Sequence, residues 1–229
     1  MKTIRVKATF LEPVLGTVAG DPEIYEQFIA SKRPDGVDPE EIEAIPTLEE
    51  DLEKGATVFA RINETGTPML WDYQIRGFFK EAFKSMIDIT GSCIDTKEKQ
   101  KKYRLTNYTC KKTVDNHIGV TPRRVELHLP EGGELTFCQR PLRAETMRGE
   151  RIALAYSEEA PAGSWVEFTI TLMDDKLEEP VLQALMYGAH KGFGQWRNSG
   201  KGRFEVEILD EEKTSPDWLN TSKIKRKTD

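Results

Sequence analysis

The chain has 229 residues, a formal net charge of −6 and 38% hydrophobic residues, a composition typical of a soluble globular protein. It contains no apolar run of membrane-spanning length, and we expect no signal peptide at its N-terminus. Its three cysteines are widely spaced and form no CxxC pair, which favours reduced thiols in a cytoplasmic protein over disulfides or a structural zinc site. We therefore expect no metal and no other cofactor.

The charges are unevenly distributed along the chain. Residues 21–54 carry twelve acidic side chains against three basic ones, whereas residues 97–151 carry thirteen basic side chains against seven acidic ones. The overall charge argues against a generic nucleic-acid binder, but such segregation allows one basic face on an acidic protein.

The first half of the chain predicts two strands and two helices. Apolar and polar residues alternate over 3–10, which predicts a half-buried strand, and "ATVFARI" (56–62) predicts a second one. Between them, Asp21 is a good N-cap for a helix over 22–32, and 34–54 is an acidic, Pro-rich surface insertion. Residues 72–87 carry an apolar stripe that predicts a helix, with Phe78, Phe79 and Phe83 in the core. Residues 91–112 are Lys-rich and predict a mobile loop or a weak helix.

The second half predicts three strands, a helix and a closing strand. The strand candidates are 118–129, 134–142 and 165–173, followed by a helix over 178–192 and a strand over 204–208. Residues 1–210 then form one domain, and the basic tail 211–229 is expected to be disordered. This order indicates an α+β fold built on a ferredoxin-like, RRM-like βαββαβ core with insertions and a C-terminal glycine-rich loop.

That loop is the strongest candidate site. In "GFGQWRNSGKGRFEVEI" (192–208), glycines alternate with cationic residues. Glycines let backbone N–H groups approach an anion, cations bind phosphate, and Trp196 offers a face for base stacking. The alternative is a loop whose glycines only permit tight turns, and the motif is neither a P-loop nor a dinucleotide fingerprint.

Further basic residues lie on the 72–87 helix and in "QRPLRAETMRGER" (139–151), where the alternative is a solvated loop paired with its own glutamates. The complete set of expected nucleic-acid-binding residues is Arg76, Lys80, Arg140, Arg143, Arg148, Arg151, Lys191, Gly192, Gly194, Trp196, Arg197, Gly200, Lys201, Gly202 and Arg203.

Four stretches resemble the RAMP superfamily of CRISPR-associated proteins, most of all the backbone subunits that coat guide RNA. They are "IRVKATFLEPVLGTVAG", "MLWDYQIRGFFKEAF", "YSEEAPAGSWVEFTITL" and "GAHKGFGQWRNSGKGRFEVEI", in the family's order over roughly 4–208. The resemblance implies an RRM-like fold that grips RNA through the glycine-rich loop and Lys80. The family's GSS-like segment is replaced by "DYQIRGFF", so the local RNA contact is expected to differ.

The resemblance implies a non-catalytic protein that binds single-stranded RNA by its phosphate backbone, with copies lined up along the strand or joined into a larger ribonucleoprotein. One alternative is a phage or mobile-element protein that binds single-stranded DNA or inhibits a CRISPR complex. Another is a RAMP-type endoribonuclease using Asp21 or a histidine, of which His190 is a better candidate than His117 or His128. A protein that binds no nucleic acid is the fourth hypothesis.

Overall fold

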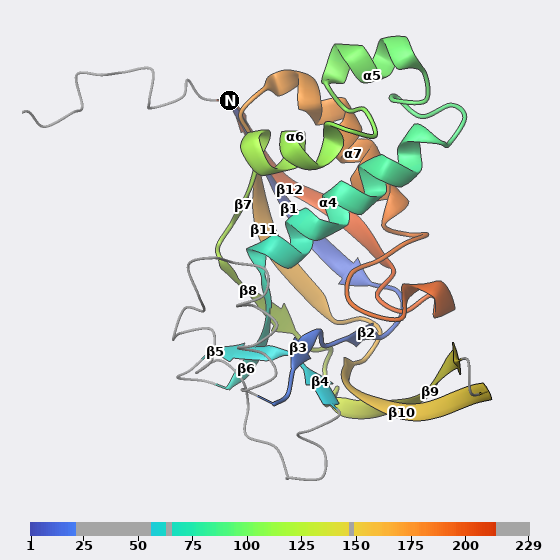
Figure 1. Cartoon of the computed structure of the whole chain (residues 1–229). Helices are drawn as coiled ribbons and strands as arrows, with labels where there is room; N and C mark the ends of the chain where they lie inside the picture. Colours follow the sequence, from blue (N-terminus) through green and yellow to red (C-terminus); the bar gives the residue numbers. More distant parts are fainter. Residues whose placement is uncertain (22–55, 63–65, 147–148, 214–229) are drawn as a thin grey trace, which may run out of the picture.

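A computed structural model describes residues 1–21, 56–62, 66–146 and 149–213, with the side chains of 142–153 excepted (Figure 1). The expected helix over 22–32, the acidic insertion 34–54 and the tail beyond 213 lie outside the described residues. No described helix is long and apolar enough to cross a membrane.

The main sheet has ferredoxin-like topology. From one edge it contains β12 (Phe204–Lys213), β1 (Lys2–Phe10), β11 (Trp165–Leu172) and then β7 (Ile118–Thr121) with β8 (Arg124–His128), neighbours being antiparallel throughout. In chain order this is the fourth, first, third and second strand of a βαββαβ unit, because α4 precedes β7 and α7 precedes β12. The predicted α+β, RRM-like fold is thus confirmed.

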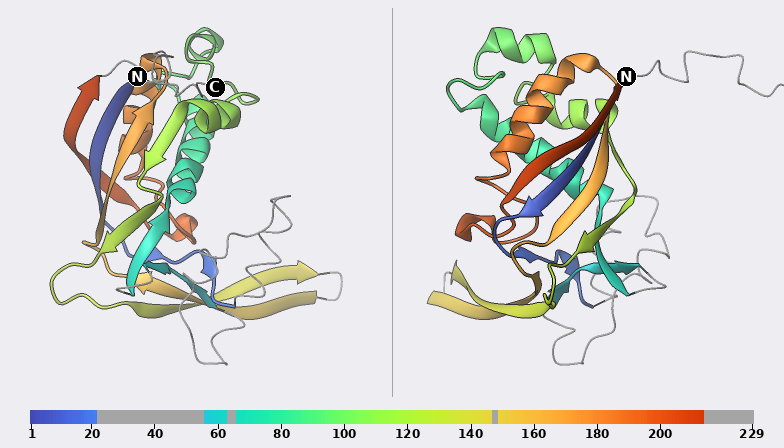
Figure 2. Two further views of the ribbon diagram at one scale, coloured as in Figure 1. Left: turned by 90° about the vertical axis from the view of Figure 1, so that its left-hand side faces the viewer. Right: turned by 180° about the vertical axis from the view of Figure 1, so that it is seen from behind.

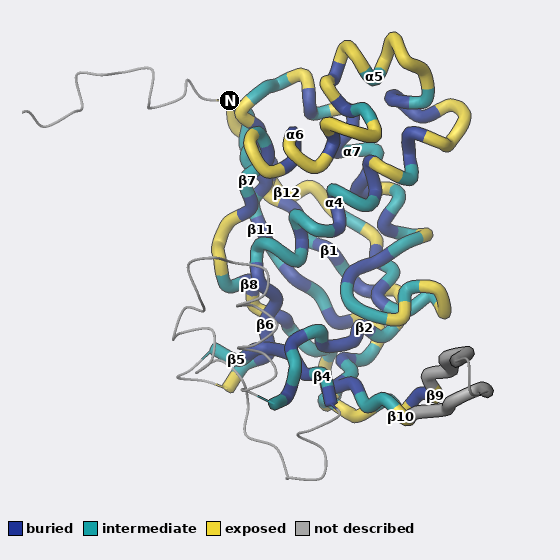
Figure 3. The backbone as a smooth tube through the Cα atoms, in the orientation of Figure 1, coloured by how far each residue is buried: buried dark blue, intermediate teal, exposed yellow. Residues whose placement is uncertain are grey.

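Helices cover one face of this sheet (Figure 2). They are α4 (Asp72–Ile87), α5 (Lys97–Tyr103), α6 (Cys110–His117) and α7 (Glu178–Tyr187), and α4 contacts both α6 and α7. The α4 stripe of apolar side chains makes this packing possible, and Phe78, Phe79 and Phe83 are buried in the core as predicted (Figure 3). The segment 91–112, predicted as a loop or weak helix, forms α5 and the beginning of α6.

A second sheet lies at the other end of the molecule. It contains β2 (Val14–Leu15), β3 (Val18–Ala19), β4 (Ala56–Val58) and the long hairpin of β9 (Thr136–Thr146) and β10 (Gly149–Ala160), which extends away from the body (Figure 2). The edge of the main sheet is completed by β5 (Ala60–Ile62) and β6 (Thr67–Trp71). Two 3-10 turns, η1 (Asp175–Leu177) and η2 (Arg197–Ser199), flank α7 and the glycine-rich loop.

Three sequence predictions are corrected by this architecture. The strand over 56–62 is interrupted at Phe59, whose N–H donates to the Glu158 carboxylate, so the chain passes from the second sheet to the main one. The strand predicted over 134–142 continues to Thr146 as β9, and residues 149–151 belong to its partner β10, so the described part of this basic stretch is strand rather than loop. The helix predicted to reach 192 ends at Tyr187, where the Gly188 and Ala189 N–H groups donate to carbonyls three residues back, Leu185 and Met186, instead of four.

The Met186 side chain of α7 is 71% exposed, whereas Ala184 of the same helix is buried. The closing strand also extends to Lys213, well beyond its predicted end at 208.

Candidate nucleic-acid interface

The two faces of the main sheet differ in charge. On the outer face, opposite the helices, the adjacent strands β12, β1 and β11 carry two cations, Arg5 and Lys7 of β1. The carboxylates of those strands on this face are Glu167, Glu205, Glu207, Asp210 and Glu212. Because phosphate is repelled by such an acidic surface, the helical side is the better candidate for nucleic acid.

On the helical side, the glycine-rich loop follows α7 and is closed by contact between its own ends. A Cβ on Gly192 would lie 1.6 Å from the Gly202 carbonyl oxygen, and Phe193 N–H donates to that oxygen at 3.0 Å. Gly194 (φ +77) lies against the Leu15 carbonyl, and Gly202 N–H donates to Pro13. These glycines are therefore explained by tight backbone approach, and the Gly202 N–H is not available to an anion.

The loop is also held by aromatic packing. Phe193 stacks on Phe204 with ring centroids 4.3 Å apart, and both rings meet Phe78 of α4 edge-on at 5.1 Å. Because all three rings are buried, their packing holds the loop in one position against α4.

Most of the predicted cations pair with carboxylates of this chain. Arg197 forms a two-pronged ion pair with Glu81 of α4, and Lys191 lies 4.0 Å from the same carboxylate. The other pairs are Arg76–Asp72 at 3.0 Å, Lys80–Asp115 at 2.5 Å, Lys201–Glu159 at 2.7 Å and Arg203–Glu12 at 3.9 Å. Arg203 also donates to the Gly200 carbonyl, and the Gly200 N–H donates to Arg197. Pairing reduces the charge that each offers to phosphate.

Arg140 differs from the other predicted cations whose side chains are described, because it forms no ion pair with a described carboxylate. It is 8% exposed, it donates one hydrogen bond to Gln195, and its Nε and Nη1 have no hydrogen-bond partner within the described part of the chain. Its guanidinium lies 5.7 Å from the ring centroid of Trp196, which is 40% exposed. A buried guanidinium with unused donors is costly unless an anion or a polar ligand completes it, so this corner fits a phosphate or a base edge.

The Cys138 thiol lies in the same region as Arg140. Burial, reinforced by the nearby Glu159 carboxylate, raises the pKa of this thiol above its ordinary value. This thiol therefore ionises less readily than an ordinary cysteine.

A second group of cations lines a groove between α4, α6 and the end of α7. Lys80 and Lys84 come from α4, Lys111 from α6 and Lys191 from the residues after α7, with Ser85, Glu81 and Asp88 completing the lining. Lys84 and Lys111 are exposed and have no ion-pair partner among the described residues. This lysine groove (Lys80, Lys84, Lys111 and Lys191) brings together two predicted residues and two that sequence reasoning missed.

A sequence signal existed for one of the missed lysines. Lys84 lies four residues after Lys80, so a helix over 72–87 necessarily puts both on one face. Lys111 offered no such signal, because its place beside α4 depends on how α6 packs.

The remaining predicted residues lie apart from the groove. Arg143 and Arg151 belong to β9 and β10, where only their backbones are described, and Arg148 lies outside the described residues. The catalytic candidates do not assemble. His128 stacks on Trp165 near the outer face, His117 ends α6, and His190 follows α7. The helix that Asp21 would cap lies outside the described residues, and the described part holds no cluster of metal-ligating side chains.

Comparisons with known proteins give no family assignment. No protein-family model matches the chain, and no curated protein sequence matches it. Among solved structures, the chain is similar to a cryo-EM structure of the Type III-B Cmr-beta bound to cognate target RNA, at 10% identity and a TM-score of 0.48. The alignment covers 92% of this chain and spans 60% of the length of that one. At this level of similarity, the function has to be argued from the residues of this chain.

Proposed function

We propose that this protein is a non-catalytic, RAMP-type single-stranded RNA-binding protein that holds its ligand by the phosphate backbone on the helical side of the sheet. The RAMP-like motifs of the sequence favour RNA over DNA and incorporation into a multi-subunit ribonucleoprotein. A reduced, cytoplasmic location fits the three free cysteines.

The observation that carries the proposal is the lysine groove. Four lysines from three separate elements converge on it against three carboxylates, Glu81 and Asp88 of the lining and the Lys80 partner Asp115. Lys84 and Lys111 have no partner in the described part of the chain. A lone solvated lysine is ordinary, but the convergence of four creates a local positive potential on an acidic protein. Phosphate groups spaced along a single strand are the ligand that such a potential recognises.

The glycine-rich loop has a supporting role in this proposal. Because its glycines are occupied in backbone packing, it contributes side chains rather than an N–H cradle: Trp196 for base stacking and Arg140 beside it for a phosphate or base edge. Glu81 holds Arg197 and thereby fixes the loop to α4.

We expect the wild-type protein to bind a single-stranded RNA of about 30 nucleotides, with an affinity that falls steeply with salt, as log K should fall by about 0.7 per phosphate contact for each tenfold increase in salt. Fluorescence anisotropy over a salt series, with a DNA of the same sequence as comparison, measures this. Equal binding of both strands would favour the alternative of a general single-strand binder. Binding of neither would refute the proposal for the isolated protein.

A further inference from the structure

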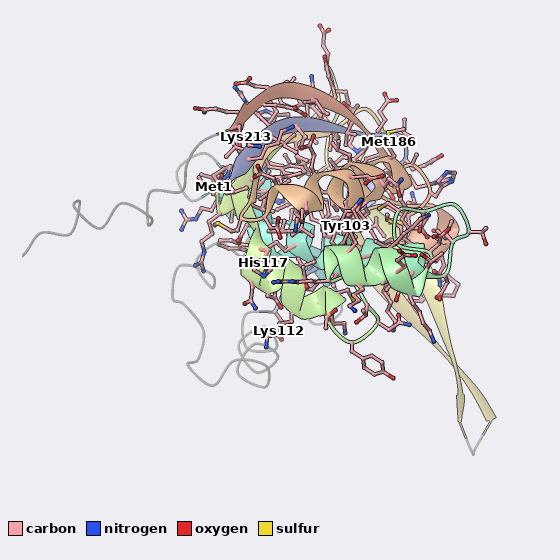
Figure 4. All side chains as sticks on the ribbon, turned by 90° about the horizontal axis from the view of Figure 1, so that it is seen from above. Met1, Tyr103, Lys112, His117, Met186 and Lys213 are labelled. Carbon is pink, nitrogen blue, oxygen red and sulfur yellow. The ribbon has the colours of Figure 1, made fainter. Side chains whose placement is uncertain are left out.

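We propose that the corner between α5 and α6 is a second contact for the same single strand, formed by Lys101, Arg104, Lys112 and the exposed ring of Tyr108. This proposal rests on the proposed function and extends it to residues that neither the glycine-rich loop nor the lysine groove includes. Figure 4 shows this end of the molecule, with Lys112 on the side of α6 that faces away from the sheet.

The cations of this corner are not neutralised. Lys101, Arg104 and Lys112 are exposed, and none has a salt bridge within the described residues. They line a groove with Thr106, Thr109, Thr113, Asn116 and His117, and no carboxylate is among its lining residues. By contrast, Lys80, Arg197 and Lys201 each form a salt bridge with a carboxylate of this chain. Here three positive charges remain available to phosphate.

The corner is rigid enough to present these groups. The backbone carbonyl of Arg104, a residue in the left-handed conformation (φ 57), accepts hydrogen bonds at 2.8 Å from the hydroxyls of Thr109 and Thr113. Leu105 is fully buried beneath the turn. A binding surface fixed in advance loses less conformational entropy when it engages a ligand.

Tyr108 adds an observation that charge does not explain. Its side chain is 96% exposed, so it contributes nothing to the core. Tyr108 stands between Arg104 and Lys112 in the sequence, in the turn that joins α5 to α6, although it does not line the groove itself. Exposed aromatic rings stack single-stranded bases in proteins whose cations bind the adjacent phosphates. A solvated, purely structural corner needs no such ring.

The helix α6 connects this corner to the lysine groove. Lys111 lines the groove on the α4 side and the next residue, Lys112, lines the corner on the α5 side. Successive side chains of a helix point about 100° apart, so one short helix can serve both surfaces. A single strand that crosses α6 would contact both.

The test compares Tyr108→Ala, Tyr108→Phe and the double variant Lys101→Glu/Lys112→Glu with wild type, by anisotropy on a 30-nucleotide RNA. We expect Tyr108→Ala to weaken binding about five-fold or more, Tyr108→Phe to bind like wild type, and the double variant to reduce the salt slope by about 1.4. Circular dichroism melting should be unchanged, since all three positions are exposed.

Three results would count against the inference, and they differ in what they say of the proposed function. If wild type binds RNA while Tyr108→Ala and the double variant bind equally well, the corner is not a contact and the proposed function stands. If Tyr108→Phe is as weak as Tyr108→Ala, the ring does not act by stacking. If wild type binds no nucleic acid, both proposals fail together.

Discussion

A Gly192→Ala variant should lose about 3 kcal/mol or more of its free energy of unfolding, or fail to fold. The added Cβ would lie 1.6 Å from the Gly202 carbonyl oxygen and 2.4 Å from the Arg203 nitrogen, both of which are backbone atoms. Relieving the clash means separating the loop ends, which breaks the Phe193–Gly202 hydrogen bond and disturbs the stacking of Phe193 on Phe204. Urea unfolding followed by circular dichroism measures the loss.

Gly77→Ala is the matched control for this variant. Gly77 lies inside α4 and nothing stands within 4 Å of the position of its missing Cβ, so alanine should stabilise the protein by about 0.5–1 kcal/mol through helix propensity. If Gly192→Ala were as stable as wild type, the loop ends would not approach each other as closely as the structure has them. The glycines would then be better explained by ligand binding than by backbone packing.

The second large effect concerns affinity. Reversing both unpaired lysines of the groove, in Lys84→Glu/Lys111→Glu, should weaken binding of a 30-nucleotide RNA by about 30-fold or more at 0.1 M salt, and the salt slope should fall by about 1.4. Both side chains are exposed, so thermal stability should change little. Anisotropy titrations at several salt concentrations test both quantities.

A control with the same change in net charge separates location from total charge. Lys7→Glu/Lys176→Glu alters the outer face of the sheet and the η1 turn, and neither residue lines the groove or the corner between α5 and α6. It should therefore bind RNA within about three-fold of wild type. A loss equal to that of the groove variant would mean that RNA responds to overall charge and has no defined path over the helices.

The sequence predicts the elements that have a local, periodic pattern, but not the pairing between segments that are distant along the chain. The helix α4 was predicted with its observed ends because its apolar stripe is a local, periodic pattern, and the same holds for β1 and β11. The strand predicted over 134–142 overlaps the first part of β9, but β10 and the β9–β10 hairpin were not predicted. Its pairing, Arg140 opposite Ala155 among others, is a property of two segments together.

The same distinction applies to the site. Arg197, Lys201 and Arg203 were correctly recognised as a basic group in a glycine-rich loop, but their partners Glu81, Glu159 and Glu12 are far away in the sequence. No local pattern indicates that such charges are paired. Conversely, residues 91–112 were predicted only as a mobile loop or a weak helix, yet Lys101, Arg104 and Lys112 there line a groove and form no salt bridge with the described residues.

The central claim is that the nucleic acid lies on the helical side of the sheet. Photo-crosslinking with RNA that contains 4-thiouridine, followed by peptide mass spectrometry, tests it most directly, because the protein offers accessible aromatic rings on both sides. We predict crosslinks to peptides that contain Trp196 and Tyr108. Crosslinks confined to Trp165, on the outer face beside His128 and Lys7, would contradict the account.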